Sequence, residues 1–343
     1  MPALNPHTLT HCKSAIYPPP KIHLLCCTDS RYAAYCGVTV TSALENNREE
    51  PLSIHILTDG ISKQDTIRFK RLEEKYRAEI NITTIPHGII RRISPSNGKW
   101  AQSIYFRLFA ADLLPENVTR IIYLDSDVII NCNLRPLWDT DMHGLPCAAV
   151  RDVNCCADDA LTGLLSPLKA LPQSSRYFNS GVMLMDIGQI RHRHINDMML
   201  SLAAEHGSRL AYPDQDILNI AFHGRWQPLA CEWNLMPWAL VPVSADLSDD
   251  ERQAVGQIAS GASRGIIHYY APYHPWDCRR LIFHPLEYIW ERYRKLSPWR
   301  NHIRRSLSPD FMTRFHRRKL QMCWRLKIRT TYDSLWMKIP KRS

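Results

Sequence analysis

Strand-like and helical segments alternate three times in the first 124 residues, and this alternation most constrains how the chain can fold. Short apolar runs of strand length occupy residues 22–28, 53–58, 79–85 and 120–124. Helical spacing of apolar residues fills 32–46, 62–76 and 104–114, and Ser62 with Asp65 forms a capping-box-like start for the second helix. Three strand–helix repeats predict an α/β fold with a doubly wound, mainly parallel sheet. Such sheets bind ligands beyond the carboxyl ends of their strands.

Two carboxylates follow the fourth apolar run, which we expect to be buried on both faces. Asp125 and Asp127 flank Ser126 there, and alternation along an extended chain would put both carboxylates on one face. Two carboxylates on one face offer oxygen ligands to Mg²⁺ or Mn²⁺, whose coordination shell substrate phosphates can complete. The alternative is a surface turn. A further pair, Asp139 and Asp141, follows a Pro-Leu-Trp segment and is expected to cap or turn the chain.

Other polar residues allow two interpretations each. His268 ends a strand-like run, 265–268, and its imidazole would suit Mn²⁺ better than Mg²⁺, although one histidine among 15 is more often structural. Asp214 opens an apolar stretch, where aspartate normally caps a helix. Asn179 is most simply a turn residue. No glycine-rich phosphate loop follows the first strand, so the dinucleotide-binding fingerprint is absent.

The net charge of +10 is confined to the end of the chain. Residues 301–343 hold 12 Lys or Arg and two acidic residues, so the preceding 300 residues carry 31 of each and no net charge. Within this extension Leu320, Trp324 and Ile328 recur at helical spacing among the cations. Apolar side chains on one face and cations on the other suit a helix lying on an anionic bilayer. We therefore expect a basic aromatic tail that associates with a membrane surface, and no nucleic-acid partner.

Length and composition set the remaining limits. The chain has 343 residues, 45% of them hydrophobic, and no run of 18 apolar residues long enough to span a membrane. Residues 1–20 are expected to form a flexible leader without the features of a secretory signal. The 11 cysteines are scattered without C-x-x-C spacing, which predicts reduced, mostly buried thiols in a cytosolic protein.

Eight short motifs occur together in one order. They are CTDSRYAAY (27–35), YFRL (105–108), YLDSDV (123–128), LRPLWDTD (134–141), YFNSGVMLMD (177–186), YPDQDILN (212–219), WNLMP (233–237) and HYYAPYHPW (268–276). In this order the chain resembles retaining glycosyltransferases of family 8, most closely the bacterial lipopolysaccharide galactosyl- and glucosyltransferases. The resemblance covers about residues 22–300 and implies a GT-A fold, with a nucleotide-sugar part at about 21–130 and an acceptor part at about 131–300.

The resemblance also implies roles for individual residues. The metal ligands would be Asp125, Asp127 and His268, and the donor would contact Asp29, Tyr32, Arg107, Asp125, Ser126 and His274. Tyr32 would stack on the uracil, and Arg107 would lie near the donor phosphates or sugar. The donor sugar would be surrounded by Asp152, Asn179, Asp214 and Gln215, with Gln215 facing the anomeric carbon.

Three positions depart from the family pattern. Arg31 stands where relatives often have Asn, and Ala271 and His274 stand where the family usually has Gly and Lys. His274 would supply the missing positive charge only when protonated, so donor affinity is expected to depend on pH.

The resemblance implies Mn²⁺-dependent transfer of galactose or glucose from a UDP-hexose, with retention, to a lipid-linked lipopolysaccharide core oligosaccharide. The enzyme would act in the cytoplasm, peripherally on the inner face of the bacterial inner membrane. Glutamine is a poor nucleophile, which favours front-face attack over double displacement. The alternatives are a self-glucosylating, glycogenin-like enzyme, a D-x-D phosphohydrolase, and a non-catalytic membrane- or nucleic-acid-binding protein.

Overall fold

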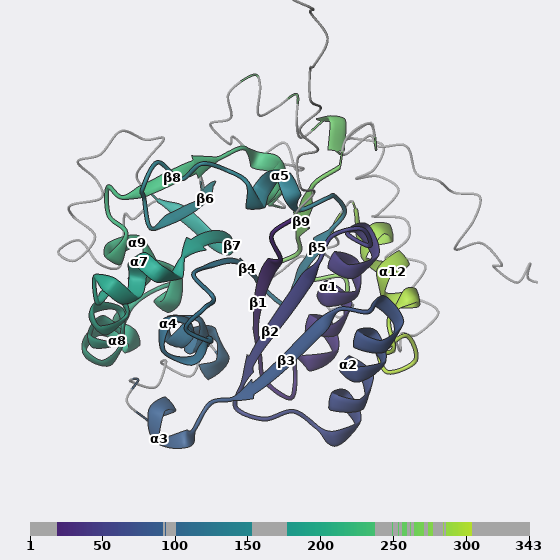
Figure 1. Ribbon diagram of the computed structural model, residues 1–343, viewed down its shortest axis with the longest axis horizontal. Coiled ribbons are helices and arrows are strands. Elements are labelled where there is room, and N and C mark those ends of the chain that lie inside the picture. Colours follow the sequence, from purple (N-terminus) through teal and green to yellow (C-terminus); the bar gives the residue numbers. More distant parts are fainter. Residues whose placement is uncertain are drawn as a thin grey trace, which may run out of the picture.

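The computed structural model describes residues 19–91, 93, 101–152, 177–236, 249, 253, 256–258, 261, 264–270, 274–276, 284 and 286–303 (Figure 1). The expectations for the leader up to residue 18, for Ala271 and for the extension from residue 304 fall outside these residues. Within the described part, no helix has the length and apolar character needed to cross a membrane.

Seven strands form one sheet in the order β3-β2-β1-β4-β7-β6-β8. They are β1 (Ile22–Thr28), β2 (Leu52–Thr58), β3 (Glu79–Thr84), β4 (Arg120–Leu124), β6 (Cys147–Arg151), β7 (Phe178–Asp186) and β8 (Trp226–Leu229). Neighbouring strands are parallel except at β7, which runs antiparallel to both β4 and β6. The predicted α/β class and mainly parallel sheet are confirmed. A small second sheet pairs β5 (Val128–Ile130) with β9 (Ile266–His268).

Helices cover both faces of the main sheet, because strand residues point alternately to the two sides. Leu24 and Cys26 of β1 pack in one core with α1 (Ala33–Asn46) and α2 (Lys63–Tyr76). Leu25 and Cys27 pack in another core, against the opposite helices. These helices are η1 (Gln102–Phe109), α4 (Ala110–Leu113), α7 (Ile187–His192), α8 (Ile195–His206) and α9 (Pro213–Ala221). Shorter elements are α3 (His87–Ile90), α5 (Arg135–Trp138), η3 (Gly207–Arg209) and η4 (Cys231–Trp233).

Local signals placed two of the three predicted helices well. The Ser62 hydroxyl accepts a hydrogen bond from the Asp65 N–H at 3.1 Å, so the predicted cap of α2 is confirmed. The predicted helix over 104–114 is instead a 3₁₀ helix, η1, followed by the short α4. Apolar spacing did not separate the two forms, since both bring residues i and i+3 to one side.

The last described helix, α12 (Glu287–Leu296), packs beside α1, on the same side of the sheet as α2 (Figure 1). Trp299, just beyond α12, is fully buried and donates its indole N–H to Asp65 of α2 at 2.7 Å. Its ring meets Phe69 at 4.7 Å between centroids and fills the space that a Cβ on Gly37 would need. The described end of the chain is therefore fixed to the body.

The described cysteines agree with the expectation of buried thiols. Six of them are free and buried: Cys26, Cys27, Cys36, Cys132, Cys147 and Cys231.

Candidate active site

The carboxylate pair lies in the turn between β4 and β5. The Asp125 N–H donates to the Gly181 carbonyl of β7 at 2.9 Å. The Ser126 hydroxyl donates to the Cys27 carbonyl at 3.0 Å, and the Ser126 carbonyl accepts from the Thr39 hydroxyl at 3.1 Å. The predicted extended chain is wrong here, because the segment turns, yet both carboxylates still face one imidazole. Ser126 holds the turn against β1.

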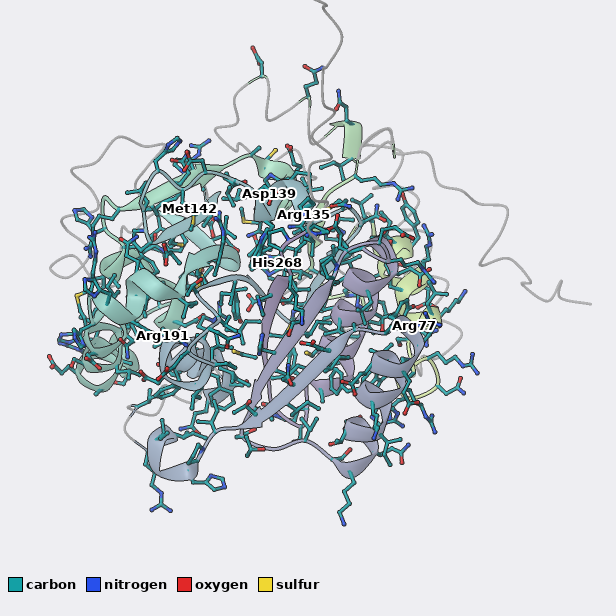
Figure 2. All side chains as sticks on the ribbon, in the orientation of Figure 1. Arg77, Arg135, Asp139, Met142, Arg191 and His268 are labelled. Atoms are coloured by element: carbon teal, nitrogen blue, oxygen red, sulfur yellow. The ribbon has the colours of Figure 1, made fainter. Side chains whose placement is uncertain are left out.

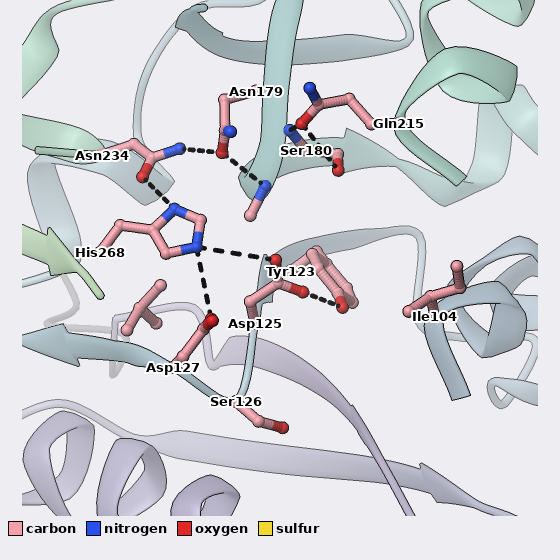
Figure 3. Close-up of polar contacts among 12 residues, drawn as sticks. Ile104, Tyr123, Asp125, Ser126, Asp127, Asn179, Ser180, Gln215, Asn234 and His268 are labelled. Atoms are coloured by element: carbon pink, nitrogen blue, oxygen red, sulfur yellow. Dashed lines mark hydrogen bonds and ion pairs between the residues drawn. The ribbon is translucent and has the colours of Figure 1, made fainter. Parts of the chain in front are cut away.

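That imidazole belongs to His268, near the middle of the molecule (Figure 2). Antiparallel pairing of Val128 with His268 brings the last residue of β9 beside the turn. His268 Nε2 lies 3.3 Å from Asp127 Oδ1 and 4.0 Å from Asp125 Oδ2 (Figure 3). One ligand atom from each of the three residues lies within 4.8 Å of the others, a spacing that a single metal ion can bridge. Two carboxylates and an imidazole form a donor set suited to Mn²⁺.

The carboxylates and the imidazoles of this site stabilise one another's charged forms because they lie close together. Burial opposes ionisation of Asp127, but His268 and His274 outweigh it and hold the pKa of that carboxyl well below its usual range. Burial likewise disfavours the imidazolium of His268, and the facing carboxylates of Asp127 and Asp125 nevertheless raise its pKa. The site therefore attracts positive charge, as a proton on His268 or as a cation between the three side chains.

A chain of hydrogen bonds fixes which imidazole nitrogen faces the carboxylates (Figure 3). The Gly181 N–H, whose role as donor is unambiguous, donates to Asn179 Oδ1 at 3.0 Å. Asn234 Nδ2 donates to the same oxygen at 2.8 Å, which turns Asn234 Oδ1 toward His268 Nδ1 at 3.0 Å. Nδ1 therefore carries the hydrogen, and the neutral imidazole presents the Nε2 lone pair to the carboxylates.

Gly181 leaves the space that this arrangement needs. A Cβ at this position would lie 2.2 Å from His268 Cε1 and 3.0 Å from Asp125 Oδ2. The glycine of the Asn-Ser-Gly segment thus allows β7 to approach the imidazole and the carboxylate together.

A buried arginine joins the carboxylate turn to α9. Arg107 Nη2 lies 2.6 Å from Asp125 Oδ1 and 3.2 Å from Asp214 Oδ2, and Nη1 donates to the Ser180 carbonyl at 3.0 Å. The guanidinium also lies 4.2 Å from the centroid of the Tyr123 ring. Burial raises the pKa of Asp214 to about 6, against the opposing effect of Arg107. Arg107 therefore holds two carboxylates at one edge of the site.

Polar side chains from β7, from α9 and from Asp152, just beyond β6, form a second, adjoining cluster. Asp152 Oδ2 accepts from Asn179 Nδ2 at 3.1 Å and from Gln215 Nε2 at 3.4 Å. Gln215 Oε1 in turn accepts from the Ser180 N–H at 3.0 Å. The interpretation of Asn179 as a turn residue is wrong, because it lies within β7 and is buried among these partners.

The two acidic residues at the start of α9 have different partners. The Asp216 carboxylate accepts from the Tyr212 N–H at 3.0 Å and from the Tyr177 hydroxyl. Asp216 therefore satisfies the helix start, while Asp214 pairs with Arg107 instead of capping the helix.

The residues expected at the uracil lie after β1. Asp29 Oδ1 accepts from the N–H groups of Arg31 and Tyr32 at 2.9 and 3.0 Å, and Oδ2 pairs with the Arg31 guanidinium at 2.8 Å. The Tyr32 ring meets Tyr35 and Trp276 edge to face. Burial raises the pKa of the Tyr32 hydroxyl to about 12, so it stays a neutral donor.

His274 lies at the carboxylate turn. Its Nε2 is 3.1 Å from Asp127 Oδ2, and its ring stacks on Trp276 at 4.6 Å and 10°. Trp276 stacks in turn on Tyr35 of α1 at 4.0 Å. The stack holds His274 against the same carboxylate that faces His268.

The structure thus brings the predicted metal ligands together and places Arg107, Asp214, Gln215, Asp152 and Asn179 beside them. Sequence reasoning missed Asn234 and Gly181, although both stand in quoted motifs. Their contacts join segments far apart in the chain, so their spacing in the sequence gives no signal. A cation held by carboxylates and an imidazole can stabilise negative charge on a departing group.

Several solved glycosyltransferase structures share this fold. A galactosyltransferase, LgtC, in complex with donor and acceptor sugar analogs superposes with a TM-score of 0.67 at 21% identity, covering 86% of this chain and 100% of that one. The bifunctional glycosyltransferase WbbM in its apo form gives 0.66 at 19% identity, covering 88% and 52%. These similarities confirm the predicted GT-A type of α/β fold.

The sequence model for glycosyl transferase family 8 matches residues 23–279, and the chain belongs to this family. It is 27% identical to a lipopolysaccharide 1,2-glucosyltransferase of Escherichia coli K12, over 80% of this chain and 77% of the relative. It is 25% identical to a lipopolysaccharide 1,3-galactosyltransferase of Salmonella typhimurium, over 79% and 77%. General stress protein A of Bacillus subtilis is 24% identical over 81% and 94%.

Proposed function

We propose that this chain transfers a hexose, galactose or glucose, from a UDP-sugar to a lipopolysaccharide core oligosaccharide, with retention and with Mn²⁺. The grouping of Asp125, Asp127 and His268 within 4.8 Å carries the proposal. Family membership and the names of the relatives support sugar transfer as the reaction.

The donor set fits a divalent cation. Asp125, Asp127 and His268 would hold it, and Gly181 leaves the imidazole and carboxylate room to converge. The imidazole favours Mn²⁺ over Mg²⁺. When bound, the ion would act as a Lewis acid that stabilises the departing nucleoside diphosphate.

The remaining side chains would bind and orient the donor. Asp29 and Tyr32 would lie against the uracil, and Ser126 and His274 would border the diphosphate. Asp152, Asn179, Asp214 and Gln215 would surround the sugar. Arg107 supports this arrangement by holding Asp125 and Asp214 with one guanidinium.

Gln215 would face the reacting carbon through its amide. An amide is a poor nucleophile, and its oxygen already accepts from the Ser180 N–H. We therefore favour front-face attack by the acceptor hydroxyl over a covalent glutamine intermediate.

The acceptor would be lipid-linked, and the enzyme would act peripherally at the cytoplasmic face of the inner membrane. The +10 charge of residues 301–343 supports attraction to an anionic bilayer. Deletion of this extension should preserve turnover on a soluble oligosaccharide and weaken sedimentation with anionic vesicles. Equal sedimentation of the shortened chain would contradict the role of the extension.

UDP release from a panel of UDP-sugars, with Mn²⁺ or with EDTA, tests the proposal. We expect Mn²⁺-dependent release from one hexose donor, and its near loss in Asp125→Asn. Free phosphate from simple phosphate esters would favour the phosphohydrolase, and a mass increase of the enzyme itself would favour self-glucosylation.

A further inference from the structure

Charge is unevenly distributed over the described surface, although residues 1–300 carry no net charge. The exposed side of α2 and its C-cap presents Lys63, Lys70, Arg71, Lys75 and Arg77, with Glu74 as the one exposed acid. The other two acids of this helix have partners, since Asp65 pairs with Arg68 at 2.8 Å and Glu73 accepts from the Ile80 N–H at 3.3 Å.

The segment 286–303 adds a second set of exposed cations. Arg292, Lys295 and Arg300 are exposed, whereas its two acids, Glu287 and Glu291, are buried. Glu291 is paired internally with Arg294 at 2.6 Å. The exposed part of this segment therefore carries cations and no acid.

The two sets lie on the same side of the sheet. Trp299 is anchored between α1 and α2 by its contacts with Asp65, Phe69 and Gly37, which fixes 286–303 alongside α2. Figure 1 shows α2 and α12 along the same side of the sheet, and Figure 2 places Arg77 at that edge. We call the exposed residues of α2, Arg77 and 286–303 the α2–α12 face.

The opposite side carries both signs of charge, with Arg193 and Arg209 exposed at the two ends of α8. Helix α8 contains no Lys or Arg and exposes Asp197 and Glu205. A neutral body whose exposed cations cluster on one side would be oriented by an anionic plane, with that side inward.

We propose that the α2–α12 face of the folded domain itself lies on an anionic lipid bilayer. Two of the four large apolar side chains that are most exposed in the described part, Ile67 at 47% and Leu296 at 40%, lie among these cations. Apolar groups beside cations gain by entering a lipid interface, which favours lipid over nucleic acid as the partner.

The extension is a poor candidate to cover this face. Residues 304–343 carry 12 Lys or Arg and two acids, so they would be repelled by it. Because the extension continues the chain after residue 303, next to the α2–α12 face, one anionic surface can attract the extension and the face together.

Charge reversal in pairs tests the inference with the full-length chain. Lys70→Glu with Arg71→Glu changes α2, and Arg292→Glu with Arg300→Glu changes the second segment. Arg193→Glu with Arg209→Glu, exposed on the α8 side, changes the net charge equally and serves as the control. Sedimentation is measured with phosphatidylcholine vesicles containing 30 mol% phosphatidylglycerol, a composition chosen for the assay, and thermal unfolding verifies folding.

Each of the two charge-reversal pairs on the α2–α12 face should raise the lipid concentration for half-maximal binding by about tenfold or more, since each cation near an anionic leaflet increases the binding constant by roughly fivefold. The control pair should change it by less than about threefold, because exposed charges more than a Debye length from the bilayer are largely screened. Equal losses in all three pairs, or less than threefold in either face pair, would overturn the proposal. So would loss of duplex DNA binding with unchanged vesicle binding.

The inference rests on the proposed function only for the membrane location of the acceptor. Vesicle binding is measured without donor or acceptor, so its failure is distinguishable from failure of sugar transfer.

Discussion

Asn234 should control metal affinity without touching the metal. In Asn234→Ala, His268 Nδ1 loses its partner at 3.0 Å and Asn179 Oδ1 loses a donor at 2.8 Å. The imidazole is then free to rotate or to exchange its tautomer, and Nε2 no longer faces the carboxylates in a fixed orientation. Loss of such an orienting partner costs roughly 10- to 100-fold in metal affinity.

Calorimetric titration with Mn²⁺ measures this effect directly. Asn47→Ala is the matched control, because Asn47 is also buried and its amide makes three hydrogen bonds, one to the Ala43 carbonyl of α1 and two to the 132–134 segment. Both variants should lose stability, by about 1–3 kcal/mol for a buried polar group left without its partner. Asn234→Ala alone should lose Mn²⁺ affinity. An affinity within about threefold of wild type, in a folded Asn234→Ala protein, would refute the orienting role.

Three further predictions concern single side chains. Asp214→Asn should raise the melting temperature at pH 7.5, because an ionised carboxyl with a folded pKa of about 6 opposes folding by up to about 3 kcal/mol. The gain in melting temperature should shrink as the pH falls toward 4, and a gain that stays constant with pH would contradict this prediction. Burial and His23 lower the pKa of His55 to about 4, so stability should fall from pH 6.5 toward 4 as the unfolded chain takes up the proton; His55→Gln should flatten that decline in a melting series. Gly181→Ala should displace the His268 imidazole and lower Mn²⁺ affinity by about tenfold or more, because a displaced ligand is no longer correctly oriented. The control is Gly88→Ala, whose added Cβ meets nothing within 4 Å and should leave Mn²⁺ affinity unchanged.

Much of the fold could be read from local pattern. Apolar runs predicted β1 and β4 to the residue, and Ser62 with Asp65 predicted the start of α2. The reversed direction of β7 could not be predicted, because strand direction depends on the connections before and after it and leaves no mark in the apolar run. The buried position of Trp299 depends on a gap at Gly37 that is distant in sequence.

The candidate site was predictable where motif and topology agreed. Asp125 and Asp127 follow a buried strand, and their placement at a sheet edge followed from the fold. His268 reaches them only through the pairing of β9 with β5, so the resemblance rather than the spacing indicated it. The prediction that Asn179 lies in a turn was wrong because asparagine favours turns. Its hydrogen-bond partners, Asp152 and Asn234, are distant in the sequence and could not be inferred from the residues around it.

We propose that one Mn²⁺ ion binds Asp125, Asp127 and His268 Nε2. Electron spin echo spectroscopy of the Mn²⁺-loaded protein tests it most directly, because a coordinated imidazole nitrogen modulates the echo. We expect one bound Mn²⁺ per chain with nitrogen modulation that disappears in His268→Gln and weakens in Asn234→Ala. Tight Mn²⁺ binding without nitrogen modulation in the wild-type protein would contradict it.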